Sequence, residues 1–208
     1  MIKAGDAFTD PREFSRERAR PLAPEDRRDA ILDAVVPLLR EKGRDVSTRD
    51  LAEAAGVAEG TLFRAFGDKE KLIAAAVERI FDPTPLWAAL RAIDLTLPLE
   101  AKLHEVLTRM HEHFRRVVSA VIALGLRERP HHGPEHRERH IADEAHLVAI
   151  LEDLFKLDEH RLAVPVATVA EYVRIVSFAS SMPMRETVLD DDVLSGLIAR
   201  GVVKEGDL

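Results

Sequence analysis

Apolar residues recur at intervals of three and four along most of the chain, and this spacing predicts an all-α protein. The first helix is expected from Pro24 or Glu25 to Lys42, since proline suits a first turn and Gly43 follows the last turn. Three further helices are predicted over 48–55, 59–66 and about 69–80. The sequence contains no run in which apolar and polar residues alternate, so no strand is predicted.

The segment Asp82-Pro83-Thr84-Pro85 interrupts this pattern and predicts a domain boundary, between a unit at 24–81 and a unit at 85–208. In the second unit, helices are expected at about 85–93, 98–126, 137–156, 165–181 and 190–200. The segment 127–140 carries two prolines and a glycine, and it predicts a loop that passes into a helix. Residues 1–23 are polar and predict a flexible arm, either a frayed tail or an arm that contacts phosphates or the minor groove of DNA.

The stretch 47–66 predicts two short helices around a tight turn. Ser47 and Asp50 have the spacing of a capping box, so the helix can start at Thr48 with its first amide groups satisfied. Gly56 ends that helix, because glycine adopts the left-handed conformation of a C-terminal cap without a Cβ clash. Leu62 and Phe66 lie four residues apart and are expected to face inward. Two helices joined by a short turn form the arrangement that places a recognition helix in the DNA major groove.

The string VSTRDLAEAAGVAEGTLFRAFGDKEKL resembles the DNA-binding domain of the TetR (tetracycline repressor) family of transcriptional regulators. The resemblance runs without a gap from about Arg27 to Phe81, roughly a quarter of the chain, and the rest is similar only in length and helical character. It implies a homodimer whose C-terminal domain senses a small molecule.

The resemblance also implies roles in DNA binding for particular residues. Ala58, Glu59 and Gly60 match positions that approach base edges, where a glutamate can accept a hydrogen bond from cytosine. Two departures are Phe63, where the family usually has tyrosine, and Ala65, where it often has histidine, and both remove polar contacts. The residues expected at the DNA are Thr48, Arg49, Ala58, Glu59, Gly60, Thr61, Phe63, Arg64 and Lys69.

Composition agrees with a globular regulator but does not identify one. The net charge is −7, yet the segment 12–72 is close to neutral and the acidic excess lies in 73–208, so the charge does not exclude DNA as a partner. The chain has no cysteine, which excludes disulfides and thiolate metal sites. No apolar run reaches eighteen residues and the N-terminus lacks a secretory signal, so a cytoplasmic protein without a membrane partner is expected.

The C-terminal unit holds the candidates for an effector pocket and for a dimer interface. Because aromatic residues make up only 5% of the chain, the sequence favours an aliphatic pocket that suits an acyl-like or other small apolar effector. The pocket candidates are Trp87, Leu90, Leu103, Leu107, Met110, Phe114, Ile150, Leu154, Tyr172 and Phe178. The helix at about 165–181 is apolar nearly all round and the last helix carries an apolar stripe, which predicts either a dimer surface or burial within one chain. The resemblance to the TetR family implies that these helices form a four-helix bundle across a two-fold axis. The interface candidates are Ala167, Ala170, Ser177, Ser181, Leu194, Leu197 and Ile198.

Nine histidines raise the question of a metal site. His132, His136 and His140 are spaced by four, but Pro134 interrupts a helix between the first two, and His111 and His113 lie on different helix faces. We therefore expect ordinary solvated or capping histidines, with a pH-responsive cluster as the alternative, and no metal or cofactor.

The sequence thus predicts a homodimeric, ligand-responsive transcriptional repressor that binds a pseudo-palindromic operator and is released by a small-molecule effector. One alternative is a DNA-binding regulator without a small ligand, controlled by a protein partner or by dimer concentration. Another is a helical metal- or small-molecule-binding enzyme, although no nucleophile–base motif or phosphate-binding glycine loop supports it, so no enzyme is expected.

Overall fold

The computed structural model describes residues 23–126, 134–182 and 189–204, and side chains from 137 onward in the second range. These residues form an all-α fold with one isolated antiparallel bridge between Leu162 and Val203. The elements are α1 (Pro24–Lys42), η1 (Gly43–Asp45), α2 (Thr48–Ala54), α3 (Glu59–Phe66), α4 (Lys69–Phe81), α5 (Thr84–Arg91), α6 (Leu99–Ala123), α7 (Pro134–Phe155), η2 (Lys156–Arg161), α8 (Val166–Ser180) and α9 (Asp191–Val202). None of the described helices is long and apolar enough to cross a membrane.

The two ends of α2 are fixed by hydrogen bonds that its sequence supplies. Ser47 Oγ accepts from the backbone N–H of Asp50, and the Asp50 carboxylate accepts from the N–H of Ser47, both at 3.1 Å. At the other end Gly56 has φ 63°, its N–H donates to Glu53 O, and the N–H of Val57 donates to Ala52 O. This pair of bonds is a Schellman motif, and it fixes the direction in which the chain enters α3.

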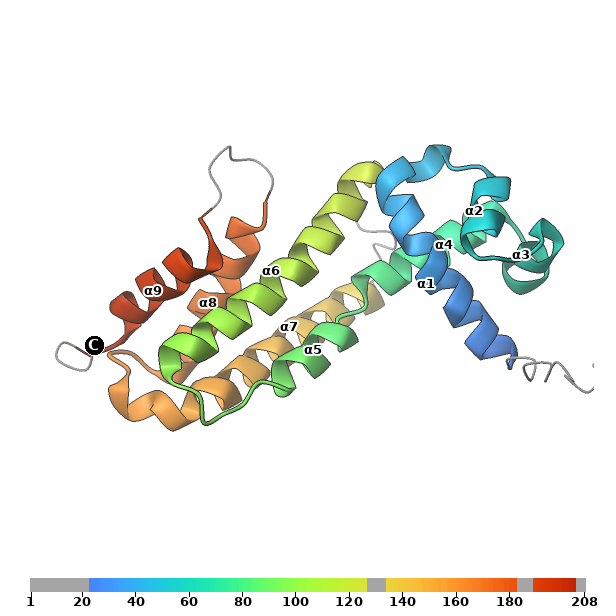
Figure 1. The fold of residues 1–208 in the computed structure, drawn as a ribbon. Helices are drawn as coiled ribbons and strands as arrows, with labels where there is room; N and C mark the ends of the chain where they lie inside the picture. The colour runs from blue at the N-terminus through green and yellow to red at the C-terminus, as the bar shows by residue number, and fades with distance from the viewer. Residues whose placement is uncertain (1–22, 127–133, 183–188, 205–208) are drawn as a thin grey trace, which may run out of the picture.

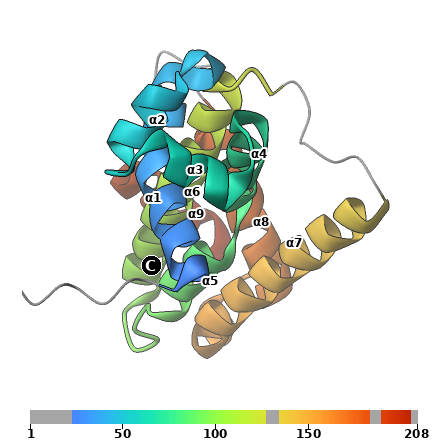
Figure 2. The ribbon, with the colours of Figure 1, turned by 90° about the vertical axis from the view of Figure 1, so that its right-hand side faces the viewer.

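Two hydrophobic cores follow one another along the chain. The first joins α1–α4 and includes Leu51, Leu62 and Phe66. The second joins α5–α9 and includes Leu107 and Phe155, both with no exposed surface. Figure 1 shows α1–α4 at one end of the molecule and α5–α9 at the other, and Figure 2 shows α3 on the outer side of the first group.

The long helix α6 connects the two cores. Leu124, at its C-terminal end, is 2% exposed and belongs to the core of α1–α4 rather than to that of α5–α9. Beside it, Arg40 Nε donates to Ser119 Oγ at 3.1 Å. The backbones also meet here, since a Cβ atom added to Gly43 would lie 2.2 Å from the carbonyl oxygen of Ala123. The end of α6 is therefore packed against the first unit without room for a side chain at position 43.

The structure corrects the expectation for 127–140 in its second half. The helix expected from about 137 begins at Pro134, where the missing N–H and the fixed φ of proline suit the first position of a helix. Residues 127–133 and the predicted arm at 1–22 lie outside the described residues. The two short 3₁₀ helices, η1 and η2, have no counterpart in the sequence-based prediction.

Candidate functional site

The helix α3 buries one face and presents the other. Leu62 and Phe66 are 4% and 5% exposed in the core of α1–α4. On the opposite face Glu59, Gly60 and Arg64 are exposed, and Phe63 is 44% exposed to solvent. The outer face of α3 thus presents charged side chains, a glycine without a side chain and an aromatic ring within about two turns.

A hydrogen bond joins the N-termini of α2 and α3. Thr48 Oγ1 donates to Glu59 Oε2 at 2.9 Å, so the glutamate expected to accept from a base is already held by the threonine expected at a phosphate. Contact of both side chains with DNA would require each to exchange or share this partner. Sequence reasoning treated the two residues separately and did not predict this contact.

Arg28, on α1, holds the C-terminal half of α3. Its guanidinium donates to the carbonyl oxygen of Ala65 and lies over the Phe66 ring, 4.3 Å from the ring centre. A cation above an aromatic face is attractive, and the carbonyl at a helix end favours a nearby positive charge. Arg28 thus fixes the rotation of α3 against α1, a role that no pattern in the sequence indicates.

Lys69 opens α4 beside η1. Its ammonium donates to Arg44 O at 3.1 Å, so this positive charge lies next to the loop that leads into α2. The neighbouring Asp68 caps α4 by accepting from the N–H of Lys71 at 2.7 Å, and that backbone hydrogen bond, with the Lys71 side chain, lowers the pKa of Asp68. All nine residues expected at DNA lie on the N-terminal part of α2, on the turn and α3, or at the start of α4.

The Lys69→Ala variant is expected to bind DNA more weakly by a similar factor for all sequences. The reason is that an ammonium contact to phosphate carries no sequence information. The slope of log K against log salt should fall by about one. Filter or fluorescence binding at four salt concentrations measures it, and an unchanged slope would remove Lys69 from the DNA contacts.

A cavity of about 210 Å³ lies among α4–α8 and has aromatic walls. Phe114 and Phe178 meet edge to face at 5.4 Å between ring centres, and Trp87 lines the same cavity. Three of the ten pocket candidates, Trp87, Phe114 and Phe178, therefore line it. Sequence reasoning missed the other aromatic and polar lining residues, Phe81, His113, His140, Asp143, Glu144 and Arg174.

The remaining pocket candidates lie elsewhere. Tyr172 is 45% exposed on α8 and does not line this cavity. Six aliphatic candidates are at most 4% exposed and pack in the core of α5–α9, where they contact other side chains: Leu90, Leu103, Leu107, Met110, Ile150 and Leu154. Spacing along a helix places a residue inward but does not say whether it meets another side chain or a cavity.

The charges around this cavity are mostly paired. Arg174 contacts Glu171 at 2.6 Å and Glu144 at 3.5 Å, and hydrogen bonding to Glu171 raises its pKa further. Burial lowers the pKa of His113 to about 4, and the positive charge of Arg116 acts in the same direction. His113 is thus a neutral ring at pH 7, and Arg174 is charged but neutralised by two carboxylates.

The unusual state of His113 gives a testable pH dependence. Because its pKa in the folded protein is about 4 and the ordinary pKa of histidine is 6.5, only the unfolded chain binds this proton between those two pH values. The free energy of unfolding should therefore fall as the pH decreases from about 6.5 towards 4. The His113→Gln variant should lose part of this slope in urea unfolding at several pH values. Equal slopes in wild type and His113→Gln would contradict the assignment.

The histidines do not form a metal site among the described residues. No group of three or more His, Asp or Glu side chains in that part of the chain is arranged to hold a metal ion. His140 lies 3.5 Å from Glu144, and the buried His111 joins α6 to Asp191 and Ser180 at 2.5 and 2.7 Å. His132 and the side chain of His136 lie outside the described residues.

The interface candidates divide into buried and exposed groups. Ala167 and Leu197 are exposed, the latter at 52%. Five others have at most 7% of their surface exposed within a single chain, where they face the chain's own core: Ala170, Ser177, Ser181, Leu194 and Ile198. Most of the exposed apolar surface of α8 and α9 belongs to other residues of the same helices. Tyr172 and Ile175 on α8 are 45% and 51% exposed, and Val193 on α9 is 47% exposed.

This fold and site define a helix-turn-helix regulator, with a DNA-binding unit followed by a second helical unit that contains a cavity. Residues 31–76 match the family model described as bacterial regulatory proteins, tetR family. This match identifies the DNA-binding unit as a helix-turn-helix domain of the TetR family.

Solved structures share the fold over most of the chain. A TetR family transcriptional regulator from Vibrio parahaemolyticus is 22% identical, with a TM-score of 0.53 over 86% of this chain and 100% of that chain. A TetR/AcrR family regulator from Thermobifida fusca YX-ER1 is 22% identical, with a TM-score of 0.56 over 84% and 95%. AibR, solved in complex with isovaleryl coenzyme A and operator DNA, is 18% identical, with a TM-score of 0.50 over 84% and 97%.

Proposed function

We propose that the protein is a homodimeric transcriptional repressor, which binds a two-fold symmetric operator through α2 and α3 and is released by a small molecule in the aromatic cavity. The observation that carries the DNA-binding part is the exposed face of α3, whose opposite face is fixed in the core by Leu62 and Phe66. A helix held in this way can enter the major groove without rearranging its own domain. Binding of operator DNA by AibR, a protein of the same fold, supports this direction.

The proposed contacts divide by type. Gly60 and Glu59 would face the bases, and Arg49, Arg64 and Lys69 would face phosphates. Thr48 would exchange its bond to Glu59 for a phosphate, which frees the glutamate for a base. Phe63 would offer an apolar surface to a thymine methyl group or to sugar, in place of the hydroxyl that tyrosine carries in the family.

Dimerisation would use the apolar surfaces that α8 and α9 leave open. Tyr172, Ile175, Val193 and Leu197 are large apolar side chains with about half of their surface exposed in the single chain. In a two-fold interface both subunits contribute the same patch, so each residue in it adds to the buried area twice. The dimer would set the distance between the two copies of α3 and thereby the spacing of the operator half-sites.

The Ile175→Glu variant is expected to weaken dimerisation by about tenfold or more, since two buried carboxylates would enter one two-fold interface. Sedimentation velocity over a range of concentrations measures the monomer–dimer equilibrium. Ile122→Glu, at a 61% exposed position on α6, is the matched control and should leave the dimer intact. Equal dimer affinity in both variants would place the interface on another surface.

The effector would be a small compound with an aromatic or other flat apolar part. The cavity volume of about 210 Å³ and the rings of Trp87, Phe114 and Phe178 favour such a ligand over the extended acyl-like effector that the sequence favoured. Phe81 and Pro83 line the cavity at the junction of α4 and α5, so a ligand there would contact the end of a helix of the DNA-binding unit. The effector would release DNA only as far as it prefers a conformer whose recognition helices are misplaced.

Selection from a random duplex library with the purified protein, read by sequencing, tests the proposal. A two-fold symmetric motif is expected, and it provides the probe for an effector screen. A motif that no compound in the screen displaces would favour control by a protein partner. No enrichment at low salt would contradict the DNA-binding role.

A further inference from the structure

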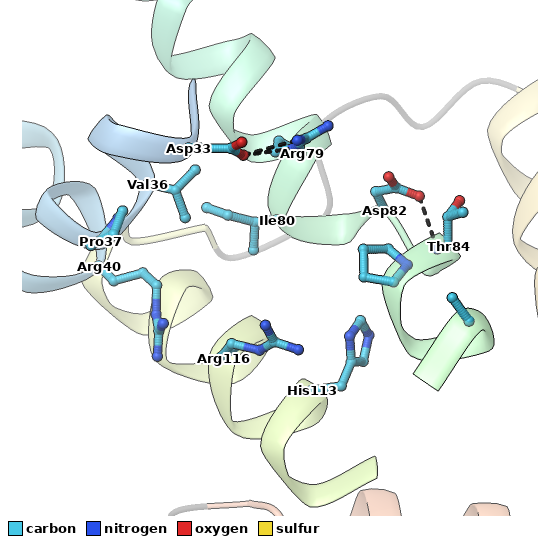
Figure 3. Close-up of a pocket in the computed structure, with 12 residues that line it drawn as sticks. Asp33, Val36, Pro37, Arg40, Arg79, Ile80, Asp82, Thr84, His113 and Arg116 are labelled. Atoms are coloured by element: carbon cyan, nitrogen blue, oxygen red, sulfur yellow. Dashed lines mark hydrogen bonds and ion pairs between the residues drawn. The ribbon is translucent and has the colours of Figure 1, made fainter. Parts of the chain in front are cut away.

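A second and larger cavity lies between the two units of the molecule. Its volume is about 550 Å³, and its walls come from α1, α4 and the start of α5 on one side and from α6 on the other (Figure 3). Five apolar residues supply part of the wall: Val36, Pro37, Ile80, Pro85 and Ala88. We call this space the interdomain cleft. It is large enough for a small organic molecule.

The carboxylates of the interdomain cleft already have partners. Arg79 donates to Asp33 Oδ1 from Nη2 and Nε at 2.9 and 3.1 Å, and Asp33 with Asp29 raises its pKa. Asp82 Oδ1 accepts from the backbone N–H of Thr84 at 3.0 Å. Figure 3 shows the Asp33–Arg79 pair on the α1–α4 side of the cleft and Asp82 beside Thr84.

Two guanidinium groups of the interdomain cleft have no carboxylate partner. Arg40 uses Nε for Ser119 Oγ, and neither Arg40 nor Arg116 forms an ion pair with any residue that the structure describes. They come from facing helices, α1 and α6, and line the same space. Three arginines against two aspartates leave one positive charge in the lining, because burial keeps His113 neutral with a pKa of about 4.

An anion in the interdomain cleft would be attracted by both guanidinium groups. Guanidinium binds planar oxyanions through paired N–H donors, and a carboxylate presents two oxygens in matching geometry. A single excess positive charge favours a monoanion over a doubly charged phosphate ester, which would meet repulsion from Asp33 and Asp82. The apolar walls favour a ligand whose carboxylate is attached to a hydrocarbon part.

We propose that the interdomain cleft binds a small organic monocarboxylate, with its carboxylate at Arg40 and Arg116 and its apolar part against Val36, Ile80 and Pro85. This site is separate from the aromatic cavity, and His113 borders both. A ligand in the cleft contacts the DNA-binding helices and α6 at once, so it stabilises one arrangement of the two units. By linkage, operator affinity then changes with occupancy of the cleft.

Octanoate, 1-octanol and octyl phosphate are suitable probes, with binding measured by isothermal titration calorimetry on the full chain. Octanoate is expected to bind at least about tenfold more tightly than 1-octanol, since a charge-assisted contact to arginine adds that much. Arg116→Gln should remove most of this preference, and Arg40→Gln/Arg116→Gln should remove all of it. Arg116→Glu should reverse it, so that octylamine binds better than octanoate. Arg137→Gln, on α7, is the charge-matched control and should bind like wild type.

The fluorescence of the single tryptophan, Trp87, distinguishes binding at the two sites, because Trp87 lines the aromatic cavity but not the interdomain cleft. Octanoate in the cleft should leave its fluorescence nearly unchanged, and Phe178→Ala should not alter octanoate affinity. The proposal is overturned if octanoate binds no better than 1-octanol, if octyl phosphate binds best, or if Phe178→Ala weakens octanoate binding while Arg116→Gln does not. None of these measurements requires DNA, so they are independent of the proposed operator binding.

Discussion

Replacing Lys102 by methionine is expected to lower the free energy of unfolding by about 3–5 kcal/mol, the usual effect of breaking a buried ion pair from one side. Lys102 is 1% exposed, and its ammonium forms an ion pair with the buried Asp158. It also donates to the carbonyl oxygens of Leu154 at 3.2 Å and Leu95 at 3.3 Å. Methionine fills most of the volume but leaves the Asp158 carboxylate and two carbonyl groups without their donor. Urea unfolding followed by circular dichroism measures the change.

Two further variants determine whether the loss comes from the unpaired charge. Lys102→Met/Asp158→Leu should recover much of the stability, because it removes the carboxylate that the first change left uncompensated. Lys42→Met breaks an exposed pair with Asp50 at 3.5 Å and should cost less than about 1 kcal/mol. A loss in Lys102→Met as small as that in Lys42→Met would show that the buried pair contributes little.

Replacing Gly60 by leucine is expected to weaken operator binding by at least about 100-fold, the size of losing one or two good base contacts. A Cβ at Gly60 meets no atom within 4 Å, so the protein itself has room for the side chain. The added atoms would instead fill the space between α3 and the floor of the groove. Stability should rise by up to about 1 kcal/mol, because glycine is a poor helix former. Thermal unfolding and operator titration, run on the same preparation, measure the two opposite changes.

Asp153→Ala is the control for this prediction. Asp153 is exposed on α7, outside the DNA-binding unit and the proposed dimer helices, and aspartate is a poorer helix former than alanine. This helix-stabilising change should leave operator affinity within about twofold of wild type. Unchanged operator binding by Gly60→Leu would show that this part of α3 does not approach the bases.

The sequence predicts local structure well where the signals lie within one turn or one helix. The bounds of α3 and the capping box of Ser47 and Asp50 follow from neighbouring residues, and the structure has them as predicted. The all-α fold is likewise confirmed, because periodicity and punctuation by proline and glycine act over short distances. The helix α7 begins about three residues earlier than expected, because Pro134 and the two residues after it have the composition of a loop.

Contacts between distant segments could not be predicted from these signals. An apolar residue such as Leu107 and an aromatic one such as Phe114 share the inward face of α6, yet only Phe114 reaches the aromatic cavity. Likewise, small residues on α8 suggested an interface, but Ala170 and Ser177 are covered by the chain's own helices. The bond between Thr48 and Glu59 and the stacking of Arg28 on Phe66 depend on how the helices are rotated against one another, which one sequence does not specify.

The contact between Gly43 and the carbonyl oxygen of Ala123 has a consequence for the mechanics of the protein. Because main chain meets main chain there, the joint contains no side chain that could change rotamer and absorb a displacement of α6. A shift of the helix end therefore passes to α1 and η1 as a rigid push rather than as a local rearrangement. Even an alanine at position 43 would force the end of α6 away from α1 and η1.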